Sequence, residues 1–224
     1  MKNTLKLPLN YKLIIFLVIL EILTIPIVAI SNSSISNNPI YLLAMGFGAG
    51  AFALVIIMLV IKSYLRKYFS RLLNTNITNI TGVLYIALIS GFLLMFMFFI
   101  QGITYYFNKS DYVVGGVSAF FSVSITLIIY KAILYVFKYG VKIKTADQTY
   151  LISFLKRDIV IITLLFTLYE TIASPLSIIW LPHTSYRFFW GIVSGVASGV
   201  IGGLPLVIIS YLTKYKITLK LYQA

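Results

Sequence analysis

The chain has 224 residues, of which 60% are hydrophobic and only 10% are charged, with a formal net charge of +13. Soluble globular proteins carry about 25% charged residues, so this composition excludes an ordinary soluble domain and indicates an integral membrane protein. The absence of cysteine excludes disulfides, thiolate metal sites and thiol nucleophiles.

Six apolar stretches are separated by short polar loops. Each stretch is about 20 residues or longer, enough to cross a hydrocarbon core of roughly 30 Å as a helix. We expect transmembrane helices at residues 12–30, 39–61, 82–107, 112–137, 159–180 and 189–211. Too little chain remains for a soluble domain. The predicted fold is therefore an all-α bundle of three helical hairpins, with residues 1–224 forming a single integral membrane domain.

The basic residues follow an alternating pattern along the chain. Fifteen lysines and arginines precede the first predicted span or follow the second, fourth and sixth, whereas only Lys109 and Arg187 lie in the intervening loops. Short cytoplasmic loops carry such an excess of positive charge. We therefore expect a multi-pass protein of the cell membrane with both termini in the cytoplasm. Its basic loops should face the lipid bilayer and its anionic headgroups, and we expect no nucleic acid partner.

Two of the basic inner loops carry apolar residues at helical spacing. Residues 63–73 and, more weakly, 144–157 show this pattern. It predicts amphipathic helices that lie on the cytoplasmic surface of the membrane. Helices that bind a partner protein are the alternative. Tyrosines such as Tyr135, Tyr139 and Tyr211 mark the same boundary, as in the aromatic belts of membrane proteins.

One short motif occurs in both the first and the fifth predicted helix. A glutamate is followed five residues later by a proline, and a glycine follows each glutamate after 25 positions, with another glycine four residues further on. The two sets are Glu21, Pro26, Gly46 and Gly50, and Glu170, Pro175, Gly195 and Gly199. We interpret this as a repeat of the first hairpin in the third, related by an axis along the membrane normal.

Glu21 and Glu170 lie near the middle of their predicted spans, where ionised carboxylates are costly and usually functional. Each proline lacks an N–H and frees the carbonyl four residues earlier, that of Ile22 or Thr171. A carboxylate beside a free carbonyl in a kinked helix can bind a monovalent cation or relay a proton. The candidate ion, proton or substrate site comprises Glu21, Glu170, Thr167, Thr171 and Ser174. The alternative is a protonated glutamate bonded to a neighbouring hydroxyl, with a proline kink that serves packing.

The sixth predicted helix carries a stripe of glycines at four-residue spacing: Gly191, Gly195, Gly199 and Gly203. Gly46 and Gly50 repeat it briefly in the second. Such stripes let another helix approach closely, but they do not specify which one. Lys131, the basic residue within a predicted span, either extends to the interface or pairs with Glu21.

The sequence contains no zinc-protease motif, phosphate-binding loop or serine nucleophile elbow, so we expect no enzyme, no metal site and no cofactor. Two functions remain. The protein transports a small solute or ion through its mid-membrane glutamates, or it is an accessory or scaffold subunit of a larger membrane complex. In the second case a partner or a second copy would dock on the glycine stripe and the inner amphipathic helices. We favour transport because packing alone does not require the glutamate to recur with its proline.

Overall fold

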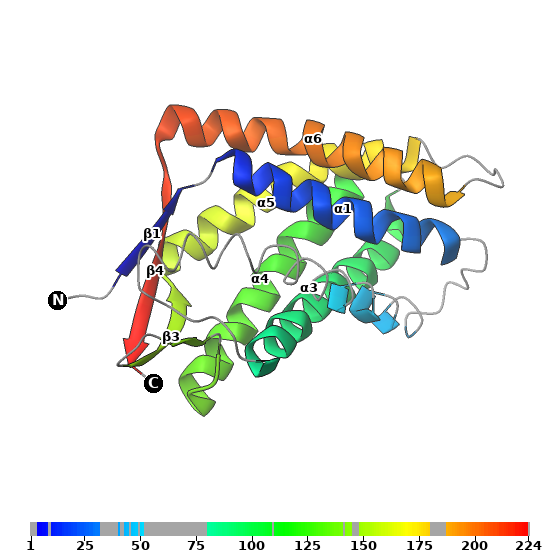
Figure 1. Ribbon diagram of the computed structural model, residues 1–224. Coiled ribbons are helices and arrows are strands. Elements are labelled where there is room, and N and C mark those ends of the chain that lie inside the picture. The colour runs from blue at the N-terminus through cyan, green and yellow to red at the C-terminus, as the bar shows by residue number, and fades with distance from the viewer. Residues whose placement is uncertain are drawn as a thin grey trace.

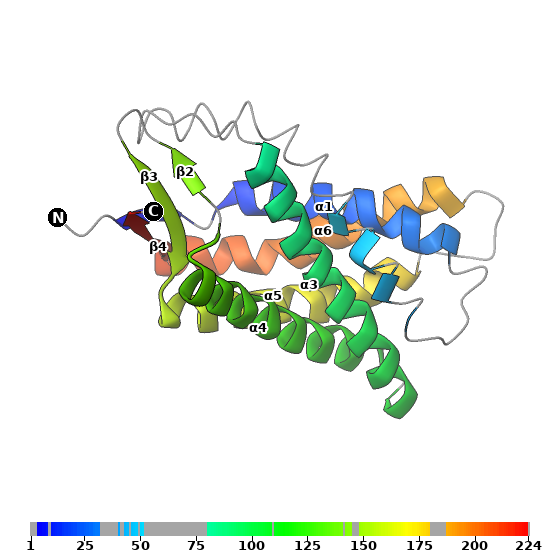
Figure 2. The same ribbon diagram turned by 90° about the horizontal axis from the view of Figure 1, so that it is seen from below.

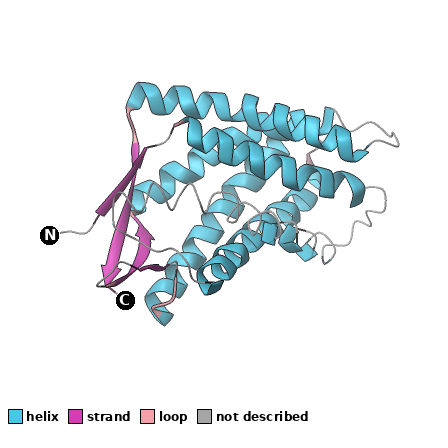
Figure 3. Cartoon of the chain, in the orientation of Figure 1, coloured by secondary structure: helices cyan, strands magenta, loops and turns pink. Residues whose placement is uncertain are grey.

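The computed structural model describes a mostly helical chain with a small sheet at one end of the helices (Figures 1 and 3). The helices are α1 (Tyr11–Ser31), α3 (Ile80–Phe107), α4 (Asp111–Phe137), α5 (Lys156–Ile179) and α6 (Arg187–Thr213). The strands are β1 (Thr4–Pro8), β2 (Lys142–Lys144), β3 (Thr149–Phe154) and β4 (Lys216–Gln223). The described residues are 4–8, 10–31, 40, 43–44, 46–48, 50–51, 80–108, 110–140, 142–144, 148–179 and 187–223.

Among the described residues, three helical segments are long and apolar enough to cross a membrane: Asp111–Phe137, Lys156–Leu176 and Phe189–Thr213. Shorter apolar segments occur in α1 and α3, at Ile14–Pro26 and Gly91–Thr104. Large apolar side chains are exposed along the helices, as the 62% exposure of Ile128 illustrates, and such surfaces suit lipid. Five of the predicted spans coincide with described helices. In the remaining span, the second along the chain at 39–61, the described residues between positions 40 and 51 are helical. Residues 52–61 lie outside the described part.

The helices pack in an order that differs from their order along the chain. α1 lies along α6, α6 also contacts α5, α5 contacts α4, and α4 contacts α3 (Figures 1 and 2). The consecutive pairs α3–α4 and α5–α6 are therefore neighbours, and the principal described neighbour of α1 is the last helix. This arrangement brings the first glutamate motif to the third predicted hairpin.

The sheet corrects the prediction of an all-α fold. Its four antiparallel strands have the order β1-β4-β3-β2. The predicted amphipathic helix at 144–157 is wrong over most of its length, because Thr149–Phe154 forms β3 and α5 begins only at Lys156. Alternation of Tyr150, Ile152 and Phe154 is a strand period, and pairing with the distant β4 decides between the two readings. The other predicted surface helix, 63–73, lies outside the described residues.

A buried glutamate and tyrosine cluster between α1, α5 and α6

The glycine stripe of α6 faces α1. A Cβ added at Gly195 would lie 2.8 Å from the carbonyl carbon and oxygen of Glu21, and one at Gly191 would lie 2.7 Å from Cα of Pro26. Gly199 meets the Val18 backbone and Gly203 meets the Ile14 side chain, so the two helices run antiparallel. The α6 glycines therefore admit the α1 backbone along the whole Glu21–Pro26 motif.

Tyr169 of α5 joins the cluster from the other side. Its hydroxyl donates a hydrogen bond of 2.9 Å to Oε1 of Glu21. The side chain is fully buried, in a core cluster with Leu17, Ala173 and Leu206. Gly202 of α6 leaves room for the ring, since a Cβ there would lie 3.0 Å from Cε2 of Tyr169. The phenol is therefore fixed by packing and points its donor at the carboxyl group of Glu21.

Glu170 follows Tyr169 directly and is only 6% exposed. Tyr169, the residue before it, binds the Glu21 carboxyl group, which places that group near the turn of α5 that carries Glu170. Within the described part of the chain, no hydrogen bond to the Glu170 carboxyl group is found. Its backbone is tightly packed, because a Cβ at Gly115 of α4 would lie 2.6 Å from the Glu170 carbonyl oxygen. One turn of α5 thus carries the buried Glu170 and the tyrosine that binds the half-buried Glu21 of α1.

The predicted hydroxyl residues lie on the α4 side of α5. Thr171 donates to the Thr167 carbonyl at 2.7 Å, and Thr167 donates to the Thr163 carbonyl at 2.8 Å. Ser174 is 9% exposed and meets Gly115, whose added Cβ would lie 2.5 Å from Cβ of Ser174. Both threonine hydroxyls are therefore engaged by their own helix, and these three residues line the α4–α5 contact.

Pro26 and Pro175 both lie inside their helices, which continue through them. Neither proline can donate to the carbonyl four residues earlier, so Ile22 and Thr171 lose that intrahelical partner. On α1 this carbonyl belongs to the residue after Glu21. The α1 motif thus offers a carboxylate and a carbonyl within one turn of the tyrosine hydroxyl.

The arrangement limits the charge that the cluster can carry. Two ionised carboxylates in a buried membrane site cost free energy unless a proton or cation neutralises them. Among the described residues there is no group of three or more His, Cys, Asp or Glu side chains that could hold a metal ion. The donor set of two carboxyl groups, a phenol and a carbonyl suits a proton or a monovalent cation better than a tightly bound multivalent one.

Other predicted features have different surroundings. Gly46 packs against α3, with an added Cβ 2.5 Å from the Leu94 carbonyl oxygen, and Gly50 is buried. The matched glycines Gly46 and Gly195 therefore contact non-equivalent helices. Lys131 does not pair with Glu21, since Arg157–Asp158 is the ion pair found among the described residues.

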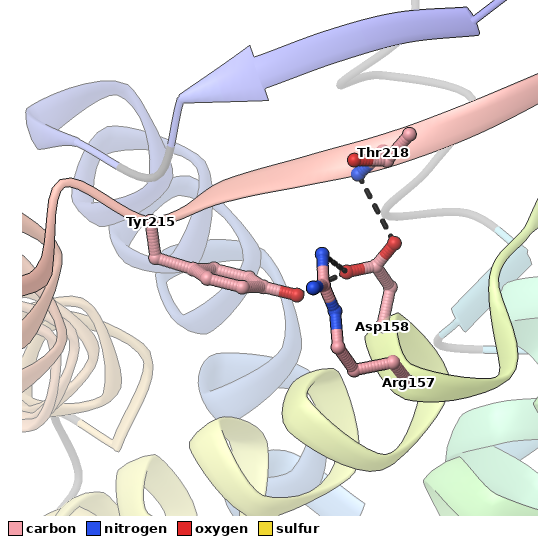
Figure 4. A network of polar contacts seen from close by, with 4 residues as sticks. All are labelled: Arg157, Asp158, Tyr215 and Thr218. Atoms are coloured by element: carbon pink, nitrogen blue, oxygen red, sulfur yellow. Dashed lines mark hydrogen bonds and ion pairs between the residues drawn. The ribbon is translucent and has the colours of Figure 1, made fainter.

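Two polar residues with defined partners, Tyr169 and Asp158, were not predicted from the sequence. Asp158 is fully buried where α5 begins and accepts hydrogen bonds from the Tyr215 hydroxyl and, at 3.2 Å, from the backbone N–H of Thr218 (Figure 4). Nη2 of the exposed Arg157 lies 3.9 Å from its Oδ1. Burial, together with the bond to Asp158, raises the pKa of Tyr215. Asp158 was recognisable as one of five acidic residues in the chain, whereas nothing distinguishes Tyr169 among 17 tyrosines.

Comparison of the chain with protein-family models, with curated proteins and with solved structures finds no match.

Proposed function

We propose that this protein is a multi-pass membrane transporter of a small solute or ion, and that the Glu21, Tyr169 and Glu170 cluster binds the transported or coupling proton or monovalent cation. The observation that carries the proposal is the hydrogen bond from Tyr169 to Glu21, which brings the Glu21 carboxyl group to the turn of α5 that carries the buried Glu170. In this proposal both chain termini face the cytoplasm of a cell membrane.

The charge of the cluster can change while the packing around it is kept. Tyr169 is held by apolar packing, and the α6 glycines hold α1 by backbone contact. Binding or release of one cation alters the repulsion between the two carboxyl groups. That change acts on α1 and α5. Of these two helices, α1 packs mainly on α6 and α5 packs mainly on α4. If two arrangements of the helices differ in their affinity for the cation, binding of the cation shifts the protein from one arrangement to the other.

The test is ion flux into liposomes that contain the purified protein. We expect Glu21→Gln and Glu170→Gln each to lower proton, Na⁺ or K⁺ flux at least about tenfold, because each removes a charge from the cluster. Asp111→Asn is the matched control, since it neutralises a carboxylate in the first turn of α4 that is not one of the cluster residues. The proposal is wrong if the correctly folded Glu21→Gln/Glu170→Gln double variant shows unchanged flux for all three ions.

Two of the docking surfaces expected for an accessory subunit have other surroundings or another structure. The glycine stripe expected to dock a partner is occupied by α1 within the same chain. The predicted docking helix at 144–157 is largely strand. We therefore retain transport as the proposal, and intact-complex mass spectrometry from native membranes is the direct check for a stoichiometric partner.

A further inference from the structure

The register of the β1–β4 pair gathers three lysines on one face of the sheet. Lys6 stands opposite Thr218, while Lys216 stands opposite Pro8 and Lys220 opposite Thr4. Directly opposed residues of an antiparallel pair share a face, as do residues two apart along a strand. Lys6 is thus flanked diagonally by Lys216 and Lys220. All three lysines are exposed. We call this group the lysine face.

The lysine face concentrates like charge. Diagonal neighbours on such a pair lie about 7–8 Å apart, within reach of long side chains, and like charges placed this way destabilise a sheet. In the part of the chain that the structure describes, no carboxylate pairs with these lysines. The nearby Asp158 is buried and bonded to Tyr215 and the Thr218 backbone. An anion bound between the ammonium groups would offset the repulsion.

The position of the sheet indicates where that anion comes from. β1 ends at Pro8, shortly before α1 begins at Tyr11, and β4 begins at Lys216, shortly after α6 ends at Thr213. The headgroup region extends about 5–8 Å beyond each side of the hydrocarbon core. The end of β1 and the start of β4 are therefore close enough to the helix ends to lie in the headgroup region.

Exposed tyrosines mark the same level. Tyr11, Tyr135 and Tyr211, at the sheet ends of α1, α4 and α6, are 58%, 69% and 81% exposed. Tyrosine is enriched where membrane helices pass through the headgroups. The sheet lies at this end of the helices (Figure 1).

We propose that the lysine face is a binding site for the phosphate of an anionic phospholipid, formed by Lys6, Lys216 and Lys220 around Thr218. The site is built from the first and last strands of the chain. An occupied site therefore stabilises the pairing of β1 with β4 and, through these strands, the sheet ends of α1 and α6. This proposal does not depend on transport by the glutamate cluster.

The test is native mass spectrometry of the full chain released from nanodiscs of mixed phosphatidylglycerol and phosphatidylcholine. We expect the wild type to retain phosphatidylglycerol, and the Lys6→Gln/Lys216→Gln/Lys220→Gln variant to retain at least about tenfold less. The matched control is Lys138→Gln/Lys156→Gln/Lys214→Gln, which removes three exposed charges at the same end of the bundle without touching the lysine face. It should keep its lipid.

Two results would overturn the inference. Equal loss of lipid from both triple variants would mean that overall charge, not the lysine face, attracts the lipid. Displacement of phosphatidylglycerol by millimolar inorganic phosphate would identify a site for soluble phosphate instead. Thermal unfolding in neutral detergent verifies that both variants fold, so loss of lipid is not confused with loss of structure.

Discussion

The two glutamate helices, α1 and α5, carry the same motif in different surroundings. On α1 the Glu21 carboxyl group accepts a bond from Tyr169, and its backbone meets Gly195 of α6. On α5 the Glu170 backbone meets Gly115 of α4. In both cases a glycine of an antiparallel neighbour lies against the glutamate carbonyl. The backbone at each glutamate therefore packs closely on a neighbouring helix. The carboxyl groups differ, because Glu21 has the Tyr169 hydroxyl of α5 as its partner, whereas Glu170 has no such donor among the described residues.

The starts of the same two helices also differ. α1 is capped locally, because Oδ1 of Asn10 accepts a bond of 3.1 Å from the N–H of Lys12. α5 begins with Asp158, whose bonds reach residues of the strand that ends the chain (Figure 4). The helix that bears Glu170 is thus tied to the sheet by a side chain, whereas the helix that bears Glu21 is held chiefly by its packing on α6.

The largest expected effect comes from filling the glycine contacts. Gly195→Ala and Gly115→Ala should each lower the free energy of unfolding by about 2 kcal/mol, because the new methyl group meets backbone atoms that cannot move aside. Unfolding in mixed detergent micelles measures the change. If α1 depends more on its glycine than α5 does, Gly195→Ala will be the more damaging of the two.

The matched control for this pair is Gly48→Ala. A Cβ at Gly48 would meet nothing within 4 Å, so the substitution should be neutral or stabilise by up to about 1 kcal/mol through helix propensity. Equal losses at all three positions would show that loss of glycine itself, and not close helix approach, is responsible.

An intermediate effect is expected where α5 joins the sheet. Asp158→Ala leaves the Tyr215 hydroxyl and the Thr218 N–H without their acceptor, which should cost about 1.5 kcal/mol. Asp111→Ala, at the start of α4, removes a carboxylate that is not buried and should cost less. Hydrogen exchange of the Thr218 amide provides the local readout. Unchanged protection in Asp158→Ala would contradict the role assigned to this bond.

The smallest effect is expected from Tyr169→Phe, which keeps the buried ring and removes only the hydroxyl. We expect a loss of about 1 kcal/mol. A double-mutant cycle sharpens the comparison of the two glutamates: Tyr169→Phe should couple to Glu21→Gln and not to Glu170→Gln. Equal coupling to both would mean that the two carboxyl groups share the tyrosine donor. Tyr112→Phe, at an exposed tyrosine, is the control.

The helices were accessible from the sequence because their signal is local. The predicted spans 112–137 and 189–211 lie within α4 and α6, and apolar length alone marks them. The sheet was not accessible in this way. Its strands lie in segments outside the helices, and they pair over long separations, as Thr4 does with Lys220. At 144–157 a weak helical period competed with the strand alternation of β3, and only the partner strand resolves that conflict.

For the candidate site the division is similar. The sequence by itself determined that Glu21 and Glu170 are apolar-span carboxylates with prolines beside them, and that α6 carries a glycine stripe, because composition and spacing are properties of a single segment. Only the tertiary structure decided that the stripe receives α1, that Tyr169 reaches Glu21, and that the Glu21 carboxyl group therefore lies near the turn that carries Glu170. These facts depend on which helices become neighbours, and the apolar surfaces of membrane helices are too alike to specify their neighbours one at a time.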